Sequence, residues 1–328
     1  MADIPCSVRA AAFRSMKNHS VLGTIALMFA TSGAAGADHF RENWSGATSP
    51  HFTVRAPSAE VLFNIPEETA GDGRVLQLLL PANPRPSPGG GAEIQSRATY
   101  LYGHFRTRLK TADCSAQPGA GVVTGYFTYL NDGKDYNGNG LPDNCEIDFE
   151  WLGAQPEVVY MTMWTDYRDA DAAQRRVGRA INLKTGQILY TCYYEAFGKC
   201  QPLAGPEAEP TTVPALPEYN SATSFYEYGF DWTPTGVTWW MTNPENGRRL
   251  VLWDYQGPSA RIPSRASYYM TNLWHTPGWA PEGMPGAVQK PTVPLSAFVD
   301  WTEYATRAEP TEQRVRRPKT GQVRTTTD

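Results

Sequence analysis

Short segments in which apolar and polar residues alternate, separated by turn-forming residues, run along most of this 328-residue chain. A period of two places apolar side chains on one face of a strand and polar side chains on the other. The predicted strands cover residues 74–80, 98–110, 121–130, 158–164, 188–194, 236–242, 250–255 and 298–304. No segment has a sustained helical period, and residues 170–180 are expected to form a loop rather than a short helix. The pattern predicts an all-β fold, a two-sheet sandwich that buries the apolar faces against each other.

The N-terminal segment has the composition of a secretory signal peptide. Basic residues precede an apolar run at 21–30, and small residues follow, ending in Ala35-Gly36-Ala37. We expect cleavage after Ala37 and a secreted protein, extracellular or periplasmic. The run is about half as long as the ~20 residues that a membrane-spanning helix needs, and a membrane-tethered N-terminus is the alternative. Met16 is the expected start, so residues 1–15 are interpreted as a misassigned extension of the signal peptide in residues 1–37.

The C-terminal segment, residues 306–328, is rich in arginine and lacks large apolar side chains. It is predicted to be a disordered basic tail, and binding of an acidic partner by this tail is the alternative. Residues 38–305 then form one folded domain. The formal net charge of the whole chain is only -4 and charged residues make up 19%, which argues against a nucleic-acid-binding surface. We expect a monomer that contacts neither nucleic acid nor, after signal cleavage, a membrane.

Cysteine usage agrees with export. Cys6 would be removed with the signal peptide, and the remaining Cys114, Cys145, Cys192 and Cys200 are an even number, as in disulfide-bonded secreted proteins. Three pairings are possible. The short loop between Cys192 and Cys200 favours that pair, which predicts a second disulfide between Cys114 and Cys145.

The most informative segment is Glu146-Ile147-Asp148-Phe149-Glu150. On a strand the three acids share one face and the two apolar residues share the other, where they can pack into the core. Three neighbouring carboxylates repel one another, so stability does not explain them and function does. The alternative is an edge strand whose acidic residues deter aggregation.

The spacing of the two glutamates fits one kind of chemistry. Residues i and i+4 of a strand lie ~13 Å apart at Cα, and side chains that lean together bring the carboxylates to ~5–6 Å, the separation of a retaining glycosidase pair. One carboxylate attacks the anomeric carbon, and the other protonates the leaving oxygen and then activates water. Asp148, between them, can share a proton and keep one acid protonated near neutral pH.

The surroundings of this segment resemble glycoside hydrolase family 16. The family signature is E-[IL]-D-x-E followed by a large residue, a small hydrophobe and glycine, and residues 146–153 (EIDFEWLG) match it. Further matches follow the family order along most of the mature chain. They are residues 91–96 (GAEIQS), 102–105 (YGHF), 108–110 (RLK), 121–123 (GVV), 127–129 (FTY), 228–232 (YGFDW), 262–265 (IPSR) and 271–274 (TNLW).

The resemblance implies a β-jelly-roll sandwich, concanavalin A-like, with an open concave cleft for a β-linked polysaccharide. It implies that Glu146 is the nucleophile, that Asp148 assists, and that Glu150 is the general acid/base. We therefore predict a secreted, endo-acting, retaining β-glucanase that uses no cofactor for its chemistry. The alternatives are a transglycosylase with the same residues, in which a sugar hydroxyl replaces water, and a non-catalytic lectin-like module.

The sequence departs from the family pattern around the signature, which leaves the polysaccharide open. Lichenases place Trp-Asp just before the first glutamate, where this chain has Asn144-Cys145. Aromatic faces stack on pyranose rings, and the family pattern favours Trp274 as a sugar contact. The full set of predicted substrate-binding residues is Trp274, Trp164, Tyr126, Phe127, Tyr226 and Asp166.

A calcium-loop pattern precedes the signature. Asp135, Asn137, Asn139 and Asp143 fit D-x-N-x-N-G spacing, but the twelfth position of the pattern is Glu146, the predicted nucleophile, and the flanking helices are missing. A carboxylate that is bidentate on calcium cannot attack a sugar. A partial, structural calcium site at the four upstream residues is one prediction, and a polar hairpin turn is the alternative.

Overall fold

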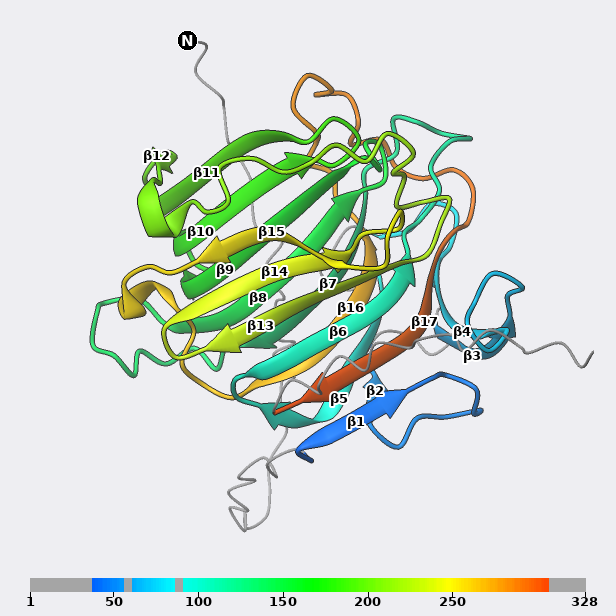
Figure 1. Ribbon diagram of the computed structural model, residues 1–328, viewed down its shortest axis with the longest axis horizontal. Helices are drawn as coiled ribbons and strands as arrows, with labels where there is room; N and C mark the ends of the chain where they lie inside the picture. The colour runs from blue at the N-terminus through cyan, green and yellow to red at the C-terminus, as the bar shows by residue number, and fades with distance from the viewer. Residues whose placement is uncertain (1–36, 56–60, 86–90, 307–328) are drawn as a thin grey trace, which may run out of the picture.

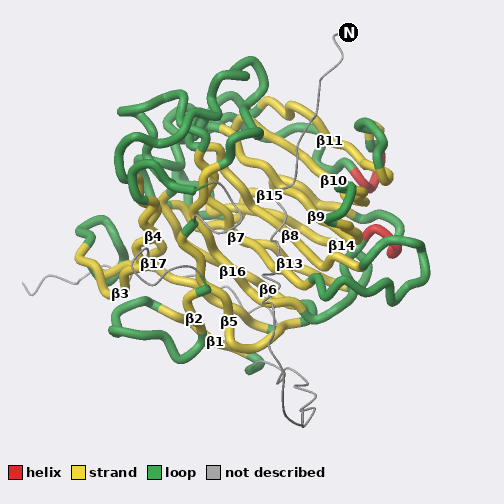
Figure 2. The backbone as a smooth tube through the Cα atoms, turned by 180° about the vertical axis from the view of Figure 1, so that it is seen from behind, coloured by secondary structure: helices red, strands yellow, loops and turns green. Residues whose placement is uncertain are grey.

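The computed structural model describes residues 37–55, 61–85 and 91–306. The predicted signal peptide with its extension, and the predicted basic tail, lie almost wholly outside the described residues. Within them the chain is strand and loop, and Figure 2 shows helix in only two short segments. These are the 3-10 turns η2 (Gly205–Glu207) and η3 (Ser259–Arg261). Neither of these turns has the length or the apolar character that crossing a lipid bilayer requires.

Two antiparallel sheets are stacked face to face, as Figure 1 shows. The first has the order β15-β14-β13-β6-β17-β4-β3, with β1 also paired to β17; the second has the order β12-β11-β10-β9-β8-β7-β16-β5-β2. The first sheet consists of β1 (His39–Glu42), β3 (Val61–Pro66), β4 (Arg74–Leu80), β6 (Gly103–Lys110), β13 (Tyr226–Thr233), β14 (Gly236–Thr242), β15 (Arg249–Tyr255) and β17 (Leu295–Ala305). The second consists of β2 (Phe52–Val54), β5 (Ala92–Tyr100), β7 (Val122–Leu130), β8 (Asp143–Leu152), β9 (Val158–Arg168), β10 (Ala173–Asn182), β11 (Gln187–Ala196), β12 (Gln201–Pro202) and β16 (Ser267–His275). The predicted all-β sandwich is confirmed.

The core lies between the two sheets and is rich in aromatic side chains. Phe149 of β8 stacks on Tyr126 of β7 with ring centroids 5.8 Å apart, and Tyr126 in turn stacks on Phe230 of β13 in the opposite sheet, at 5.4 Å. Ile147 and Phe149 are fully buried there, as their alternation with the three acids predicts. The acids of β8 therefore point away from the core, on the outer face of the nine-stranded sheet.

Two predictions about secondary structure were wrong. Residues 98–110 are two strands, because Tyr102 and Gly103 adopt positive φ angles of 60° and 112° and turn the chain between β5 and β6. Residues 173–182, within the predicted loop, are the strand β10. Its arginines hid the strand pattern, since Arg179 is 1% exposed and lies among the core residues. That guanidinium donates to the carbonyls of Ala208, Pro210 and Leu252, which satisfies it without a carboxylate partner.

One of the two predicted disulfides forms and the other does not. Cys192 and Cys200 are bonded, with Cα atoms 5.2 Å apart, whereas Cys114 and Cys145 are free and buried. Cys145 lies at the start of β8, and Cys114 packs its Sγ against Gly153, just beyond the other end of that strand. Eight strand residues span roughly 26 Å, far beyond the ~7 Å that a disulfide allows between Cα atoms.

The free thiols lead to a first expected result. Alkylation of the denatured, unreduced protein should label Cys114 and Cys145, while Cys192 and Cys200 should be labelled only after reduction. In the native protein neither free thiol should react at neutral pH, because burial raises the pKa of Cys145 and raises the pKa of Cys114 to about 12. Peptide mapping checks this, and a Cys114–Cys145 linked peptide would contradict the structure.

Candidate active site

Three carboxylates line the outer face of β8, in the middle of the nine-stranded sheet. Strand register sets their neighbours. Glu146 lies between Tyr129 of β7 and Trp164 of β9, and Glu150 lies between Gly125 of β7 and Tyr160 of β9. Glu146 and Glu150 are partly exposed. The two glutamates are thus open to a ligand that lies across the strands.

Asp148, between them, is 2% exposed and is held from the β9 side. Its Oδ2 accepts hydrogen bonds from the Thr162 hydroxyl and, at 3.1 Å, from the Trp164 indole Nε1. A hydrogen bond also joins Asp148 to Glu146, which requires a proton on one of the two. Burial and the neighbouring glutamate charges raise the pKa of Asp148 well above its usual value, so the proton resides on Asp148.

The two glutamates have raised and unequal pKa values. Burial raises the pKa of Glu146 to about 7, against the hydrogen bonds from Asn144 and Asp148 and the charge of Arg176, which lower it. Burial and the Glu146 charge raise the pKa of Glu150 to about 8, again against Arg176. Both carboxyl groups therefore hold protons more tightly than a free glutamate, which lets one of the pair stay protonated near neutral pH while the other is ionised.

On the β10 side of the row, Arg176 supplies positive charge. It is paired in register with Trp164, and its Cζ lies 4.9 Å from the Trp164 ring and 4.0 Å from the Tyr194 ring of β11. The guanidinium is only 4% exposed. Stacking between two aromatic side chains holds this cation on the carboxylate face.

On the opposite side of β8, a second buried acid shares the face. Glu93 of β5 and Asn272 of β16 are paired in register, and Asn272 is paired with Gly125, next to Glu150. A Cβ on Gly125 would lie 2.6 Å from the Asn272 Oδ1, so this amide crosses the strand where glycine leaves room. Burial raises the pKa of Glu93 to about 7.

Comparison with known proteins identifies the fold family. Residues 58–182, which include β8, match the family described as "Glycosyl hydrolases family 16". Residues 58–182 are thus similar to glycoside hydrolase family 16. A beta-glucanase of Paenibacillus polymyxa is 24% identical over 71% of this chain and 71% of that protein. A probable xyloglucan endotransglucosylase/hydrolase of Nicotiana tabacum is 35% identical over 23% of this chain and 22% of that protein.

Solved structures with a similar course of the chain include two named glucanases. A lichenase from a mouse hindgut metagenome is 20% identical, with a TM-score of 0.49, over 83% of this chain and 100% of that one. A Bacillus licheniformis beta-glucanase is 19% identical, with a TM-score of 0.48, over 83% of this chain and 99% of that one.

Within this family 16 fold, three of the predicted sugar contacts lie on the carboxylate face. Trp164 is beside Glu146, Phe127 is paired in register with Asp148, and Trp274 of β16 packs partly buried beside the apolar cluster that includes Tyr160. Trp279, from the loop after β16, contacts Tyr160 edge-on with centroids 5.2 Å apart. The predicted open cleft above this face stays a prediction, and these side chains are its candidate lining.

The other three predicted contacts lie elsewhere. Tyr126 is fully buried and Tyr226 is 7% exposed, and both belong to the core between the sheets. Tyr126 has the opposite side-chain direction from its neighbour Phe127, as strand alternation requires. Asp166 is also fully buried, and it accepts a hydrogen bond of 2.6 Å from Asn139 and pairs with Arg175. These three positions cannot touch a sugar on the carboxylate face, so their assignment was wrong.

The sequence reasoning missed Glu93, Asn272 and Arg176 as members of the site. Glu93 and Asn272 lie inside segments that matched the family pattern, but the pattern alone did not place them on neighbouring strands and on the same face as the β8 acids. Arg176 was hidden because its strand was interpreted as a loop. The signal that could have found it is the alternation of Arg176, Gly178 and Ala180 with Val177, Arg179 and Ile181, whose side chains point inward.

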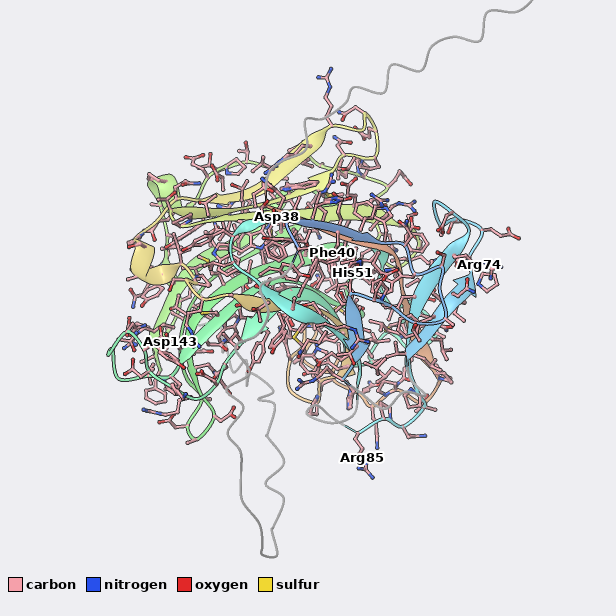
Figure 3. The ribbon with its side chains drawn as sticks, turned by 90° about the horizontal axis from the view of Figure 1, so that it is seen from below. Asp38, Phe40, His51, Arg74, Arg85 and Asp143 are labelled. Carbon is pink, nitrogen blue, oxygen red and sulfur yellow. A yellow bond between two sulfur atoms is a disulfide. The ribbon has the colours of Figure 1, made fainter. Side chains whose placement is uncertain are left out.

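The four residues of the predicted calcium site form a compact polar turn, and the calcium site stays a prediction. The Asp135 carboxylate accepts hydrogen bonds from the backbone N–H groups of Gly138, Asn139 and Gly140, and Asp143 accepts one from Tyr136. The Asn137 and Asn139 side-chain oxygens also accept bonds from backbone N–H groups of the loop, at Asn139 and Leu141. Figure 3 shows Asp143 beside this loop, at the opposite end of the molecule from Arg74. The side-chain oxygens that could bind a cation accept hydrogen bonds from backbone N–H groups of the same loop, in the manner of Asx turns.

Removal of divalent cations should therefore change little. We expect the melting temperature in excess EDTA and in millimolar calcium to agree within about 1 °C, because the loop's own hydrogen bonds hold the turn. Differential scanning calorimetry in the two buffers measures this. A rise of several degrees with calcium, lost in Asp135→Asn, would instead establish the site.

Proposed function

We propose that this protein is a retaining endo-β-glucanase in which Glu146 is the nucleophile and Glu150 is the general acid/base. The observation that carries the proposal is the outward row on β8, where two partly exposed glutamates flank a buried aspartate and both have raised pKa values, of about 7 and about 8. Double displacement needs one glutamate ionised and the other protonated. The beta-glucanase relative from Paenibacillus polymyxa supports a β-glucan as substrate.

The proposed first step starts with Glu146 ionised and Glu150 protonated. Glu146 attacks the anomeric carbon while Glu150 gives its proton to the leaving glycosidic oxygen. Once Glu146 is esterified its negative charge is gone. Because that charge helps to raise the pKa of Glu150, its loss lowers the proton affinity of Glu150 at the moment when a base is required. Glu150 then takes a proton from water, and the hydroxide displaces the sugar from Glu146.

Asp148 supports both steps without meeting the substrate. Its protonated carboxyl donates to Glu146, and the bonds from Thr162 and Trp164 fix the orientation of that carboxyl. A sugar chain lying across the strands would meet Phe127, Asn272 and Glu93 on one side of β8 and Trp164 and Arg176 on the other. The chemistry needs no cofactor.

We further propose that the protein is exported and works as a monomer. The signal-peptide composition of residues 1–37 supports export. The Cys192–Cys200 disulfide is also typical of an oxidising compartment.

Transglycosylation is the second candidate, supported by the partial match to the tobacco protein. It would use the same carboxylates, with a sugar hydroxyl in place of water in the second step.

The test is incubation of the purified protein with mixed-linkage glucan, β-1,3-glucan, xyloglucan and soluble chitin, with Glu146→Gln as control. New reducing ends on one polymer, absent in the control, would establish the hydrolase and its substrate. Transfer to a labelled oligosaccharide acceptor without new reducing ends would establish the transglycosylase. Neither product on any polymer would reject both.

A further inference from the structure

Asn144 lies two residues before Glu146 on β8, at a register irregularity between β8 and β9. Its Nδ2 donates to the Glu146 Oε2 at 2.7 Å, and the residue is 1% exposed. The direction of this bond follows from chemistry, since an ionised carboxylate only accepts and an amide nitrogen only donates. The position that departs from the lichenase pattern thus contacts the proposed nucleophile directly.

The other end of the same amide has no partner. The Asn144 Oδ1 is buried without a hydrogen bond among the described residues. An orphaned buried carbonyl destabilises a fold, and a branched apolar side chain at this place would avoid that cost. Packing therefore does not explain an asparagine here. A site that breaks a local rule of stability is where a functional role is expected.

The surroundings of Glu146 make a donor at this place important. The titratable and charged groups facing it come from five strands and are mostly acids or phenols. They are Asp148 and Glu150 on β8, Tyr129 on β7, Tyr160 and Tyr167 on β9, Arg176 on β10 and Glu93 on β5. Among these described groups Arg176 is the cation, and Asn144 and Asp148 are the hydrogen-bond donors to Glu146. A neutral donor that cannot lose its proton stabilises the ionised carboxylate at every pH.

We propose that Asn144 is a positioning residue that holds the Glu146 carboxylate ionised and fixes its orientation for attack. The inference rests on the proposed nucleophilic role of Glu146. It assigns to the Asn144 amide a task in the reaction itself rather than in sugar stacking, which the aromatic residue of lichenases at this place implies. The bond forms before substrate arrives, so the carboxylate is already oriented in the free enzyme.

The test compares Asn144→Leu, which keeps the branching at Cγ but removes the donor, with Asn144→Asp, which keeps the shape and adds a second acid. The acidic limb of kcat/KM against pH should move up by about one pH unit in Asn144→Leu and further in Asn144→Asp. The kcat value should fall by at least about tenfold, with KM little changed. The melting temperature of Asn144→Leu should be equal or higher, because the orphaned carbonyl is gone.

Asn182→Leu is the matched control, since Asn182 caps the turn after β10 through Thr185 and lies away from the carboxylates. It should leave the pH profile unchanged. An unmoved acidic limb in Asn144→Leu, or a loss of melting temperature that accounts for the loss of activity, would overturn the inference. Carbon-13 NMR titration of the Glu146 carboxyl, assigned with Glu146→Gln, measures the same shift without substrate. It separates failure of this inference from failure of the proposed function.

Discussion

Replacing Glu146 with glutamine should lower kcat/KM on the preferred polysaccharide by at least about four orders of magnitude. The amide keeps the shape and the contact with Asn144 but has no lone pair with the nucleophilicity of a carboxylate, so the glycosyl-enzyme cannot form. Reducing-end assays on the purified variant measure the loss. The folded state should persist, because the substitution is isosteric and removes a charge that burial disfavours.

Comparison with Glu150→Gln distinguishes loss of the nucleophile from loss of the general acid. An acid is needed only when the leaving group is a poor one, so Glu150→Gln should keep much of its first-step rate on an aryl oligoglucoside with a good leaving group. Glu146→Gln should be inactive on both substrates. Equal loss for the two variants on the aryl substrate would show that the roles of nucleophile and acid were assigned wrongly.

The second large effect is on stability. At pH 8 the Glu146→Gln variant should be more stable than the natural sequence by about 3 kcal/mol, because ionised Glu146 is costly in the folded state. Burial raises the pKa of Glu146 from its ordinary value of 4.5 to about 7. Between these two values the folded state binds more protons than the unfolded state. The free energy of unfolding of the natural sequence therefore falls as pH rises through this window, and the variant lacks this dependence.

Urea denaturation at pH 4, 6 and 8 measures the effect. The two proteins should have similar free energies of unfolding at pH 4 and should diverge up to about pH 8. Glu303→Gln is the contrasting variant, because Glu303 pairs with Arg41 and Arg106 on the other sheet and its removal should destabilise the protein. A stability difference for Glu146→Gln that is constant with pH would contradict the raised pKa.

Much of the fold could be predicted because strand alternation and turn residues are local signals. The bounds of β4 and β14 agree with the predicted segments, since proline or glycine marks their ends. The break between β5 and β6 escaped because alternation continues on both sides of it. The strand β10 escaped because arginine is rarely buried, and Arg179 is satisfied by the Thr191 hydroxyl of β11 and by carbonyls from segments farther away in the sequence.

The site residues, too, could be predicted where the signal is local and not where it depends on contacts between strands. Placing Glu146, Asp148 and Glu150 together requires only the period of a strand, and the structure puts them on one face. Tyr126 and Phe127 are adjacent, so alternation allows only one of them to lie on the outer face. Which one does so depends on how β7 is placed against β8, which the sequence does not specify. The Cys114–Cys145 pair was inferred by elimination, and it fails because Cys145 lies near the start of β8 whereas Cys114 packs against Gly153, beyond the other end of that strand. Arg176 required three strands to be placed in order.

The backbone of β8, which carries the proposed catalytic glutamates, is also held by a hydrogen bond from the opposite sheet. The Trp239 indole of β14, fully buried in the opposite sheet, donates to the Asp148 carbonyl at 3.0 Å. This carbonyl lies midway between the two glutamates, so the separation of their backbones is anchored by a bond that neither glutamate makes. Substitutions on the outer face can then alter which sugar is accepted while the distance between the reacting groups is kept. Side chains on the outer face of the sheet can therefore be substituted to change the substrate while the separation of Glu146 and Glu150 is kept, provided that Trp239 is retained.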